Sequence, residues 1–218
     1  MSTTLGTPPL TSVANAVVLH NVRWETYEAL LKDHEWSSSP RFTYDEGTLE
    51  IMSPLRFHET ANRVVAYLVD IILDEWQIDC DNIGSLTLKA SSQSKGLEPD
   101  TCFYIRNVGA LDGKNTPDLE QGDPAPDLVI EIDDTSPSVA KLPIYAAFGV
   151  PEVWRVRKTG VDILLLHGGE YVAAPESKSL PKLTPTVIRD LLDRSEPLTR
   201  FAWAGEVRAW ARANAPGG

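Results

Sequence analysis

The chain has 218 residues, of which 31 are acidic and 20 are basic, so its formal net charge is −11. Apolar residues make up 42% and charged residues 23% of the sequence, which is typical of a water-soluble globule with a buried core and excludes wholesale disorder. The negative charge argues against a broad nonspecific phosphate-binding surface but leaves room for a local basic groove. A chain of this length most simply forms one domain with additions.

Residues 1–18 are rich in Thr, Ser, Pro and Ala and lack the basic start and apolar block of a secretory signal, so they predict a flexible tail. No stretch approaches the roughly 18 apolar residues of a membrane span. Cys80 and Cys102 are the only cysteines, too few for a disulfide framework, and we expect two buried thiols. We therefore expect a cytoplasmic protein with no membrane partner.

The N-terminal part of the chain predicts a short helix and a β-hairpin. Residues 24–32 (WETYEALLK) have the apolar spacing of an amphipathic helix. Residues 41–45 and 48–52 flank Glu46-Gly47, a turn pair that favours a hairpin.

The clearest helix is expected over residues 57–77. Its apolar residues line one stripe at 100° per residue: Phe57, Ala61, Val64, Leu68 and Ile72. His58 falls at the edge of that buried stripe, whereas Glu59 points toward the polar side. A lone histidine in such a place is more often a core-edge residue than a functional one.

The second half of the chain alternates strands and helices. Strands are predicted over residues 83–88, 100–106 and 128–133. The last two are joined by a long connection at 107–126 that is rich in Gly, Pro and Asp. A helix is expected from Ser136-Pro137-Ser138 through Phe148, closed by Gly149. A hairpin at 152–157 and 161–167 follows, and Leu191-Leu192 and residues 198–213 suggest terminal helices. The fold class is thus mixed α/β, a central mixed sheet flanked by helices, with an N-terminal β-hairpin and a C-terminal helical extension.

Several common catalytic motifs are missing from the sequence. There is no phosphate loop of the form G-x-x-x-x-G-K-[ST], no G-x-G-x-x-G, no G-x-S-x-G and no H-E-x-x-H. These absences disfavour P-loop nucleotide hydrolysis, Rossmann-type redox chemistry, serine hydrolysis and zincin chemistry.

Two carboxylates at strand positions are the strongest chemical signal. Asp100 follows Glu98-Pro99 at the mouth of a strand, and Glu131 shares a face with Val129 in an otherwise apolar strand. Such carboxylates form a hard oxygen site suited to Mg2+ or Mn2+. A nearby lysine, for which Lys141 is the candidate, would neutralise charge on phosphate oxygens. The structural alternatives are that Asp100 is a turn residue and that Lys141 is a solvated surface residue. Glu131 is harder to explain in this way, because a charge in a buried strand is costly without a partner.

At these residues the chain resembles the bacterial "putative restriction endonuclease" family of the PD-(D/E)XK nuclease superfamily. The likeness covers roughly residues 20–200 and is carried by three segments in order: 45–59 (DEGTLEIMSPLRFHE), Glu98-Pro99-Asp100 and 126–154 (PDLVIEIDDTSPSVAKLPIYAAFGVPEVW). The strand GSLTL at 84–88 is also similar to one that the family carries there. The resemblance implies a sheet core flanked by helices with a metal held between central strands. It makes 19–196 a nuclease domain and 197–218 a C-terminal helical extension and tail.

The resemblance also implies roles for individual residues. Asp100 and Glu131 are the metal ligands, Lys141 is the lysine displaced onto the next helix, and His58 matches the histidine of the first long helix. Glu59 is the candidate for the superfamily's helix glutamate and a further metal ligand. Glu50, which alternates with Thr48 and Met52, is a further contributor to weigh. The usual lysine position is occupied by Asp133, which adds negative charge beside Glu131.

The leading hypothesis is a Mg2+-dependent endonuclease that hydrolyses DNA and leaves a 5′-phosphate, by superfamily analogy, with a homodimer as one way to complete a DNA groove. The alternative is a catalytically inactive protein of the same fold that binds nucleic acid or serves in assembly. A carboxylate-pair hydrolase of another class, such as a glycosidase, is weaker. The C-terminal stretch mixes basic and aromatic residues and predicts either a nucleic-acid or subunit contact or a helix that docks on the core: Arg200, Trp203, Arg208, Trp210 and Arg212.

Overall fold

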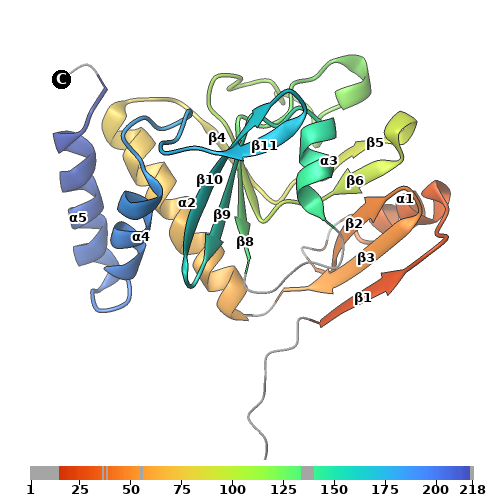
Figure 1. Ribbon diagram of the computed structural model, residues 1–218, viewed down its shortest axis with the longest axis horizontal. Helices are drawn as coiled ribbons and strands as arrows, with labels where there is room; N and C mark the ends of the chain where they lie inside the picture. The colour runs from red at the N-terminus through yellow and green to blue at the C-terminus, as the bar shows by residue number, and fades with distance from the viewer. Residues whose placement is uncertain (1–14, 36, 38, 55, 134–139, 217–218) are drawn as a thin grey trace, which may run out of the picture.

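Two β-sheets lie side by side in the computed structural model, which describes residues 15–35, 37, 39–54, 56–133 and 140–216. The smaller sheet and one short helix form one flank, and the larger sheet is packed between helices (Figure 1). No helix in the described part of the chain is long and apolar enough to cross a membrane. Cys80 and Cys102 are both free thiols, as expected from the sequence.

The smaller sheet has the strand order β1-β3-β2-β6-β5 and is antiparallel throughout. Its strands are β1 (Asn15–Leu19), β2 (Arg41–Asp45), β3 (Thr48–Ser53), β5 (Leu88–Ala90) and β6 (Lys95–Leu97). Glu46 and Gly47 both have positive φ, 46° and 93°, so the predicted hairpin turn is confirmed. Helix α1 (Trp24–Asp33) covers one face of this sheet by stacking Tyr27 on Tyr44 at a ring-centroid distance of 5.0 Å.

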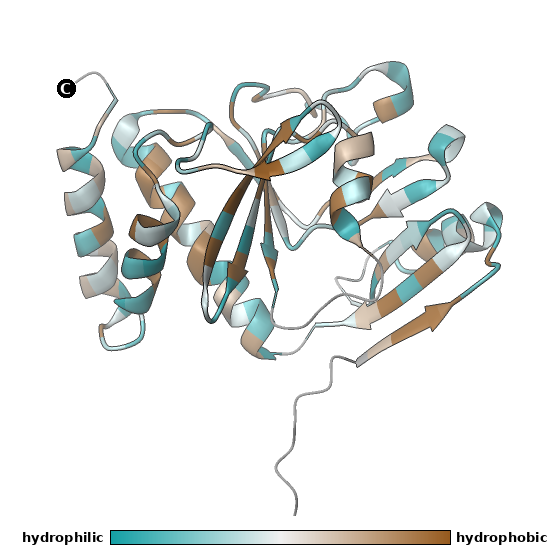
Figure 2. Ribbon diagram, in the orientation of Figure 1, coloured by the Kyte–Doolittle hydropathy of each residue, from teal (hydrophilic) through white to brown (hydrophobic). Residues whose placement is uncertain are grey.

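The larger sheet is the mixed sheet that the sequence predicts. Its order is β11-β10-β9-β8-β7-β4, and β8 pairs with β9 in parallel while the other neighbours are antiparallel. The strands are β4 (Asp81–Gly84), β7 (Thr101–Tyr104), β8 (Leu128–Ile132), β9 (Glu152–Arg157), β10 (Gly160–His167) and β11 (Glu170–Ala173). The central strands are the most apolar part of the sheet (Figure 2).

Helices cover both faces of the larger sheet. Helix α2 (Arg56–Trp76) packs on the face that carries Leu128 and Ile130, and α4 (Pro185–Asp193) and α5 (Arg200–Ala213) join the same core. Helix α3 (Lys141–Ala147) packs on the other face, which carries Val129. The alternation of β8 thus places its odd and even residues in two separate cores, as predicted. Two 3-10 turns, η1 (Ser91–Gln93) and η2 (Leu119–Gln121), complete the described elements.

Several boundaries differ from the sequence predictions. Residues 83–88, expected to form one strand, divide between β4 and β5 of different sheets, because Gly84 adopts a positive φ of 68° and turns the chain out of the larger sheet. Residues 15–18, expected in the tail, belong to β1. The cap expected at Ser136-Pro137-Ser138 lies outside the described residues, and α3 is described from Lys141 onward.

The C-terminal helix docks on the core. The Trp203 indole is buried and donates a 2.7 Å hydrogen bond to the Leu191 carbonyl. Arg208 and Arg212 both form ion pairs with Glu75 on α2. Of the two predicted roles for this stretch, the docking helix therefore describes most of its residues, and the exposed Arg200 at its start is an exception.

Candidate functional site

Asp100 is the most heavily bonded side chain of the candidate site. It lies where the chain passes from β6 to β7 and is only 1% exposed. Its Oδ1 atom is paired with the Arg41 guanidinium, and its Oδ2 atom accepts a 2.8 Å hydrogen bond from the Ile132 amide. His58 Nε2 lies 3.1 Å from the same Oδ2 atom. Asn62 donates to the Asp100 carbonyl at 2.8 Å, so two turns of α2 and the end of β8 hold this residue in place.

Glu131 lies beside Asp100 on the neighbouring strand. The β7–β8 register pairs Thr101 with Ile130, so continuing it by one residue sets Asp100 opposite Glu131 on the face that carries Val129. The Glu131 carboxylate accepts a 2.7 Å hydrogen bond from Lys141 Nζ and another from the Tyr145 hydroxyl. Both carboxylates are buried, and each is matched by a cationic side chain.

The structure brings together the four residues that the sequence and the family resemblance singled out: Asp100, Glu131, Lys141 and His58. Lys141 is the first residue of α3, and this position lets its amine reach back to the end of β8. Burial lowers the pKa of His58, and the nearby Arg41 charge lowers it further, while Glu131 acts in the opposite direction. Burial and the Arg41 charge thus both favour the neutral imidazole of His58.

Glu59 enters the site indirectly. Its Oε1 atom lies 2.7 Å from Arg41 Nη2, so the guanidinium bridges Glu59 and Asp100. The side chain of Glu59 is 36% exposed, compared with 13% for His58. The helical position that favours His58 for direct contact with the buried carboxylate agrees with this geometry, and Glu59 contributes through Arg41.

Sequence reasoning missed Arg41 and Tyr145. Arg41 comes from β2 of the smaller sheet, 59 positions before Asp100, and nothing in the local pattern of that hairpin indicates its partner. Tyr145 lies four residues after Lys141, which places both side chains on the same face of α3. That spacing is a signal which could have identified Tyr145 once Lys141 was a candidate.

Two other acidic residues near the site have clear structural partners. Asp133, which replaces the usual lysine, is paired with Arg155 of the neighbouring strand β9, so its charge is compensated. Glu98 accepts hydrogen bonds from the Phe42 amide at 2.9 Å and from the Thr87 hydroxyl at 3.3 Å. Burial raises the pKa of Glu98. The Glu98 side chain thus ties the loop before Asp100 to the smaller sheet.

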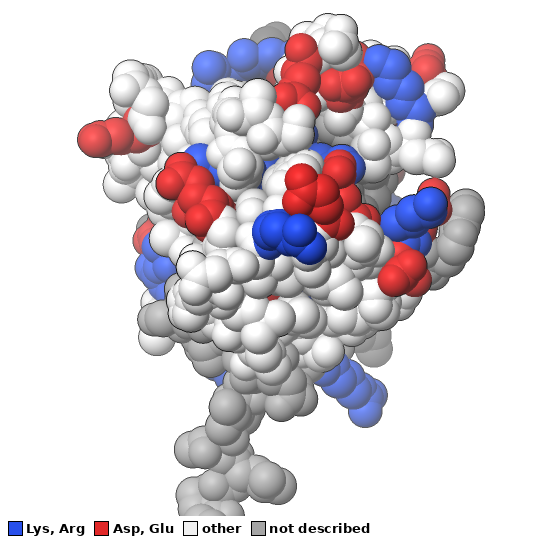
Figure 3. Space-filling view, turned by 90° about the vertical axis from the view of Figure 1, so that its right-hand side faces the viewer, with Lys and Arg blue, Asp and Glu red and all other residues white. Residues whose placement is uncertain are grey.

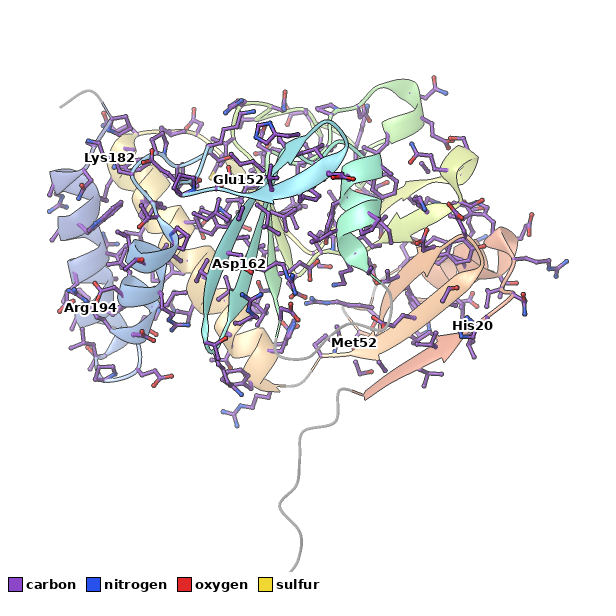
Figure 4. The ribbon with its side chains drawn as sticks, viewed as in Figure 1. His20, Met52, Glu152, Asp162, Lys182 and Arg194 are labelled. Atoms are coloured by element: carbon purple, nitrogen blue, oxygen red, sulfur yellow. The ribbon has the colours of Figure 1, made fainter. Side chains whose placement is uncertain are left out.

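Glu152, labelled in Figure 4, is a fully buried acid of the larger sheet that has a structural role. Its carboxylate accepts from the Trp154 indole at 2.7 Å and from the amides of Lys178 and Ser179 at 3.1 and 2.8 Å. Asp127 similarly accepts from three consecutive amides, those of Ile105, Arg106 and Asn107. These two buried acids are therefore explained by the segments that they bind.

The candidate site offers the type of ligand atom that a hard divalent cation binds. Asp100 and Glu131 supply carboxylate oxygens from adjacent strands, which are the ligands that Mg2+ and Mn2+ prefer. Among the described residues, however, no three His, Cys, Asp or Glu side chains are grouped so that they could hold a metal ion by themselves. Instead, Asp100 forms an ion pair with Arg41, and Glu131 forms one with Lys141.

A mixed sheet with helices on both faces, and two facing carboxylates at adjacent strands, defines a restriction-endonuclease-like fold. The sequence profile of the Uma2 family, described as "Putative restriction endonuclease", matches residues 24–191. Because that match covers well over half of the chain, the protein belongs to this family, and the family suggests a nuclease. A comparison with curated proteins finds no match.

Proposed function

We propose that the protein is an endonuclease that hydrolyses DNA phosphodiester bonds with a divalent cation, Mg2+ or Mn2+, held by Asp100 and Glu131. The observation that carries this proposal is the meeting of these two buried carboxylates with Lys141 and His58 at one end of the larger sheet. When bound, such a cation neutralises phosphate charge and lowers the pKa of a coordinated water.

The protein's own side chains supply position and charge. Lys141, whose amine lies 2.7 Å from Glu131, is placed to neutralise charge that develops on the phosphate oxygens. Tyr145 and the Ile132 amide fix the orientations of Glu131 and Asp100, respectively. His58 supports Asp100 by approaching its Oδ2 atom, and Glu59 supports Arg41 from the opposite end of the guanidinium.

A second candidate function is a protein of this fold that binds nucleic acid or assembles with other proteins without cutting. It is favoured by one observation: both carboxylates are already compensated by Arg41 and Lys141, so the site is electrostatically balanced without a metal. The homodimer and the cytoplasmic location expected from the sequence stay predictions under either function.

The two functions are separated by a cleavage assay with plasmid and single-stranded DNA in the presence of Mg2+ or Mn2+. The variants are Asp100→Asn and Glu131→Gln, which remove a charge but keep the side-chain shape. We expect the wild type to cleave and each variant to lose at least about 100-fold in rate, the scale of lost electrostatic stabilisation in an active site.

Asp162→Asn is the matched control, because Asp162, labelled in Figure 4, pairs with Arg157 in the β9–β10 hairpin and is not one of the candidate site residues. It should cleave like the wild type. Circular dichroism melts establish that each variant is folded. Cleavage that persists in both site variants, or that never appears with either metal, overturns the nuclease proposal.

A further inference from the structure

A groove of about 680 Å³ begins at Arg41 and Asp100 and follows helix α2 away from the carboxylate site. The helix contributes residues at spacings of three and four, from Glu59 through Arg63 and Tyr67 to Asp70. Residues at those spacings share a helix face. At 1.5 Å per residue these eleven steps extend for about 17 Å, which is the length of about five nucleotide steps of a B-form strand.

The rest of the lining comes from two segments that pack beside α2. One segment is β4 with the turn after it, which contributes Asn82, Gly84 and Ser85. The other is the connection from α4 to α5 with the first turn of α5, which contributes Ser195, Arg200 and Trp203. The groove is therefore built from five separate parts of the chain, and it shares Arg41, Glu59 and Asp100 with the candidate site.

The acids that line the groove all have partners within the protein. Asp100 and Glu59 are both paired with Arg41. The Asp70 carboxylate accepts from the Asn82 side-chain amide at 2.9 and 3.0 Å. Arg41 therefore compensates the charges of Asp100 and Glu59, whereas the Asn82 amide orients the Asp70 carboxylate without neutralising its charge.

Two of the arginines in the groove are uncompensated. Arg63 and Arg200 are exposed, and neither forms an ion pair within the part of the chain that the structure describes. The Arg200 guanidinium lies 4.4 Å from the centroid of the Tyr67 ring, and Tyr67 itself packs 6.0 Å from Trp203. A cation–π contact of this kind holds the charge at the groove while leaving its N–H donors available.

Much of the basic charge elsewhere on the described surface is paired with acidic side chains. On the face shown in Figure 3, basic side chains lie beside acidic ones and do not form a continuous basic patch. The ion pairs Lys89–Glu28, Lys95–Asp45 and Lys114–Asp123 are examples. A net charge of −11 excludes a broad phosphate-binding surface, but it is compatible with a narrow groove that carries two free guanidinium groups.

We propose that this groove binds the phosphodiester backbone of a DNA strand, with Arg63 and Arg200 on its phosphates, beside Arg41 and Asp100 of the candidate site. The inference deepens the proposed nuclease function, since it names the surface that holds the substrate. Arginine suits phosphate oxygens because its planar fork donates two parallel hydrogen bonds. Tyr67 acts as a positioning residue that holds Arg200.

The test measures DNA binding without cleavage, by fluorescence anisotropy of a short fluorescein-labelled DNA, as a single strand and as a duplex, in EDTA and across a salt series. The variant is the double substitution R63A/R200A. We expect its dissociation constant to rise at least about tenfold at low salt, because two phosphate contacts are lost. For the single strand, the slope of log K against log salt should fall in magnitude by about 1.4.

The double substitution R23A/R106A is the matched control, because Arg23 and Arg106 are also exposed arginines without an ion pair among the described residues but lie outside the groove. It removes the same charge and should leave the dissociation constant within about twofold. An equal loss in both double variants, an unchanged affinity in R63A/R200A, or a wild type that binds neither DNA overturns the groove proposal. Because EDTA prevents metal-dependent cleavage, these outcomes are independent of the cleavage assay, which alone decides the nuclease proposal.

Discussion

Arg41 is the residue that most changes the interpretation of the candidate site, because it compensates the charge of Asp100. It is 6% exposed, it reaches from the smaller sheet into the larger one, and it is shared between Asp100 and Glu59. A buried carboxylate needs a compensating charge, and Arg41 supplies that charge to Asp100 in the structure described here. A metal ion on Asp100 would supply the same compensation, so the guanidinium and the ion compete for one carboxylate.

This competition predicts the behaviour of Arg41→Gln. In EDTA the free energy of unfolding should fall by about 3–5 kcal/mol, the usual cost of removing one partner from a buried ion pair. Added Mn2+ should then raise the melting temperature of this variant more than that of the wild type, since ion binding to the native state stabilises it. Urea denaturation in EDTA and thermal melts with and without Mn2+ measure both effects.

Glu59→Gln is the control for Arg41→Gln, because it removes the guanidinium's more exposed partner and keeps the pair with Asp100. Its effect on stability should be about 0–1 kcal/mol, as for exposed pairs. A variant at Arg41 that is as stable as the wild type in EDTA, or that gains no more from Mn2+, would show that Arg41 does not compensate Asp100.

At the scale of single residues, sequence patterns singled out two carboxylates that the strand register places opposite each other, whereas they gave no signal for side chains that pair between the two sheets. Asp100 and Glu131 could be identified because a proline precedes one and apolar neighbours surround the other. Arg41 could not, since the pattern of β2 is that of an ordinary hairpin strand and the partner lies in a different sheet. Lys141 was a candidate from its place early on the helix that follows the Glu131 strand, and the family resemblance then implied its role.

Among the elements, the long helix and the central strands were predicted closely. The helix expected over 57–77 is α2, Arg56–Trp76, and the hairpin strands 152–157 and 161–167 are β9 and β10. The strands that sequence reasoning missed are short: β5 and β6 have three residues each, β11 has four and β1 has five. Such segments carry too few residues to show a period, and their hydrogen-bonded partners define them as strands.

Two glycines give opposite predictions for the same substitution to alanine. Gly96 in β6 faces the ring of Tyr27, and an added Cβ would lie 2.7 Å from Tyr27 Cε1. Tyr27 is fully buried and stacked on Tyr44, so it has no room to move. Gly96→Ala should lower the free energy of unfolding by about 1–3 kcal/mol, as overpacking does.

Gly205 lies on the exposed side of α5, where an added Cβ meets nothing within 4 Å. Gly205→Ala should therefore raise the free energy of unfolding by about 0.5–1 kcal/mol, because alanine restricts the unfolded chain and favours the helix. Urea denaturation of both variants under one condition makes the comparison. A neutral Gly96→Ala would mean that α1 is not held against β6 by Tyr27.

Over the whole molecule, the site lies at the junction of the two sheets. The chain leaves β6 of the smaller sheet at Leu97 and enters β7 of the larger sheet at Thr101, so Glu98 and Asp100 lie in the connection itself. Asp100 is bonded to the Arg41 side chain of the smaller sheet and to the Ile132 amide of the larger sheet, and Glu98 is bonded to β2 through the Phe42 amide. Nothing in the sequence indicated that the predicted hairpin belongs to a second sheet, because that depends on the pairing of β2 with the short strand β6.

Glu98 should therefore couple the stability of the smaller sheet to the site. Glu98→Ala leaves the buried Phe42 amide without its acceptor, which costs about 1–3 kcal/mol. We expect hydrogen–deuterium exchange to speed up in β1, β2 and β3, while β8 and β9 keep their protection. The two sheets would then open as separate units at different free energies. Uniform acceleration in both sheets, or none, would contradict this coupling.

Glu98→Gln is the matched variant, and its effect should depend on pH. Burial raises the pKa of Glu98 in the folded protein, so below the ordinary glutamate value the acid is protonated in both the folded and unfolded chains and costs nothing. As the pH rises through that value, the unfolded chain loses its proton first, and the wild type loses free energy of unfolding until the folded pKa is passed. Glutamine keeps an acceptor for the Phe42 amide and has no proton to lose. The free energy of unfolding of Glu98→Gln minus that of the wild type should therefore be larger at pH 7 than at pH 4. Urea denaturation of both proteins at the two pH values measures this difference. A difference that is the same at both values would mean that the Glu98 carboxylate is hydrated in the folded protein, and that the connection between the sheets is open to water.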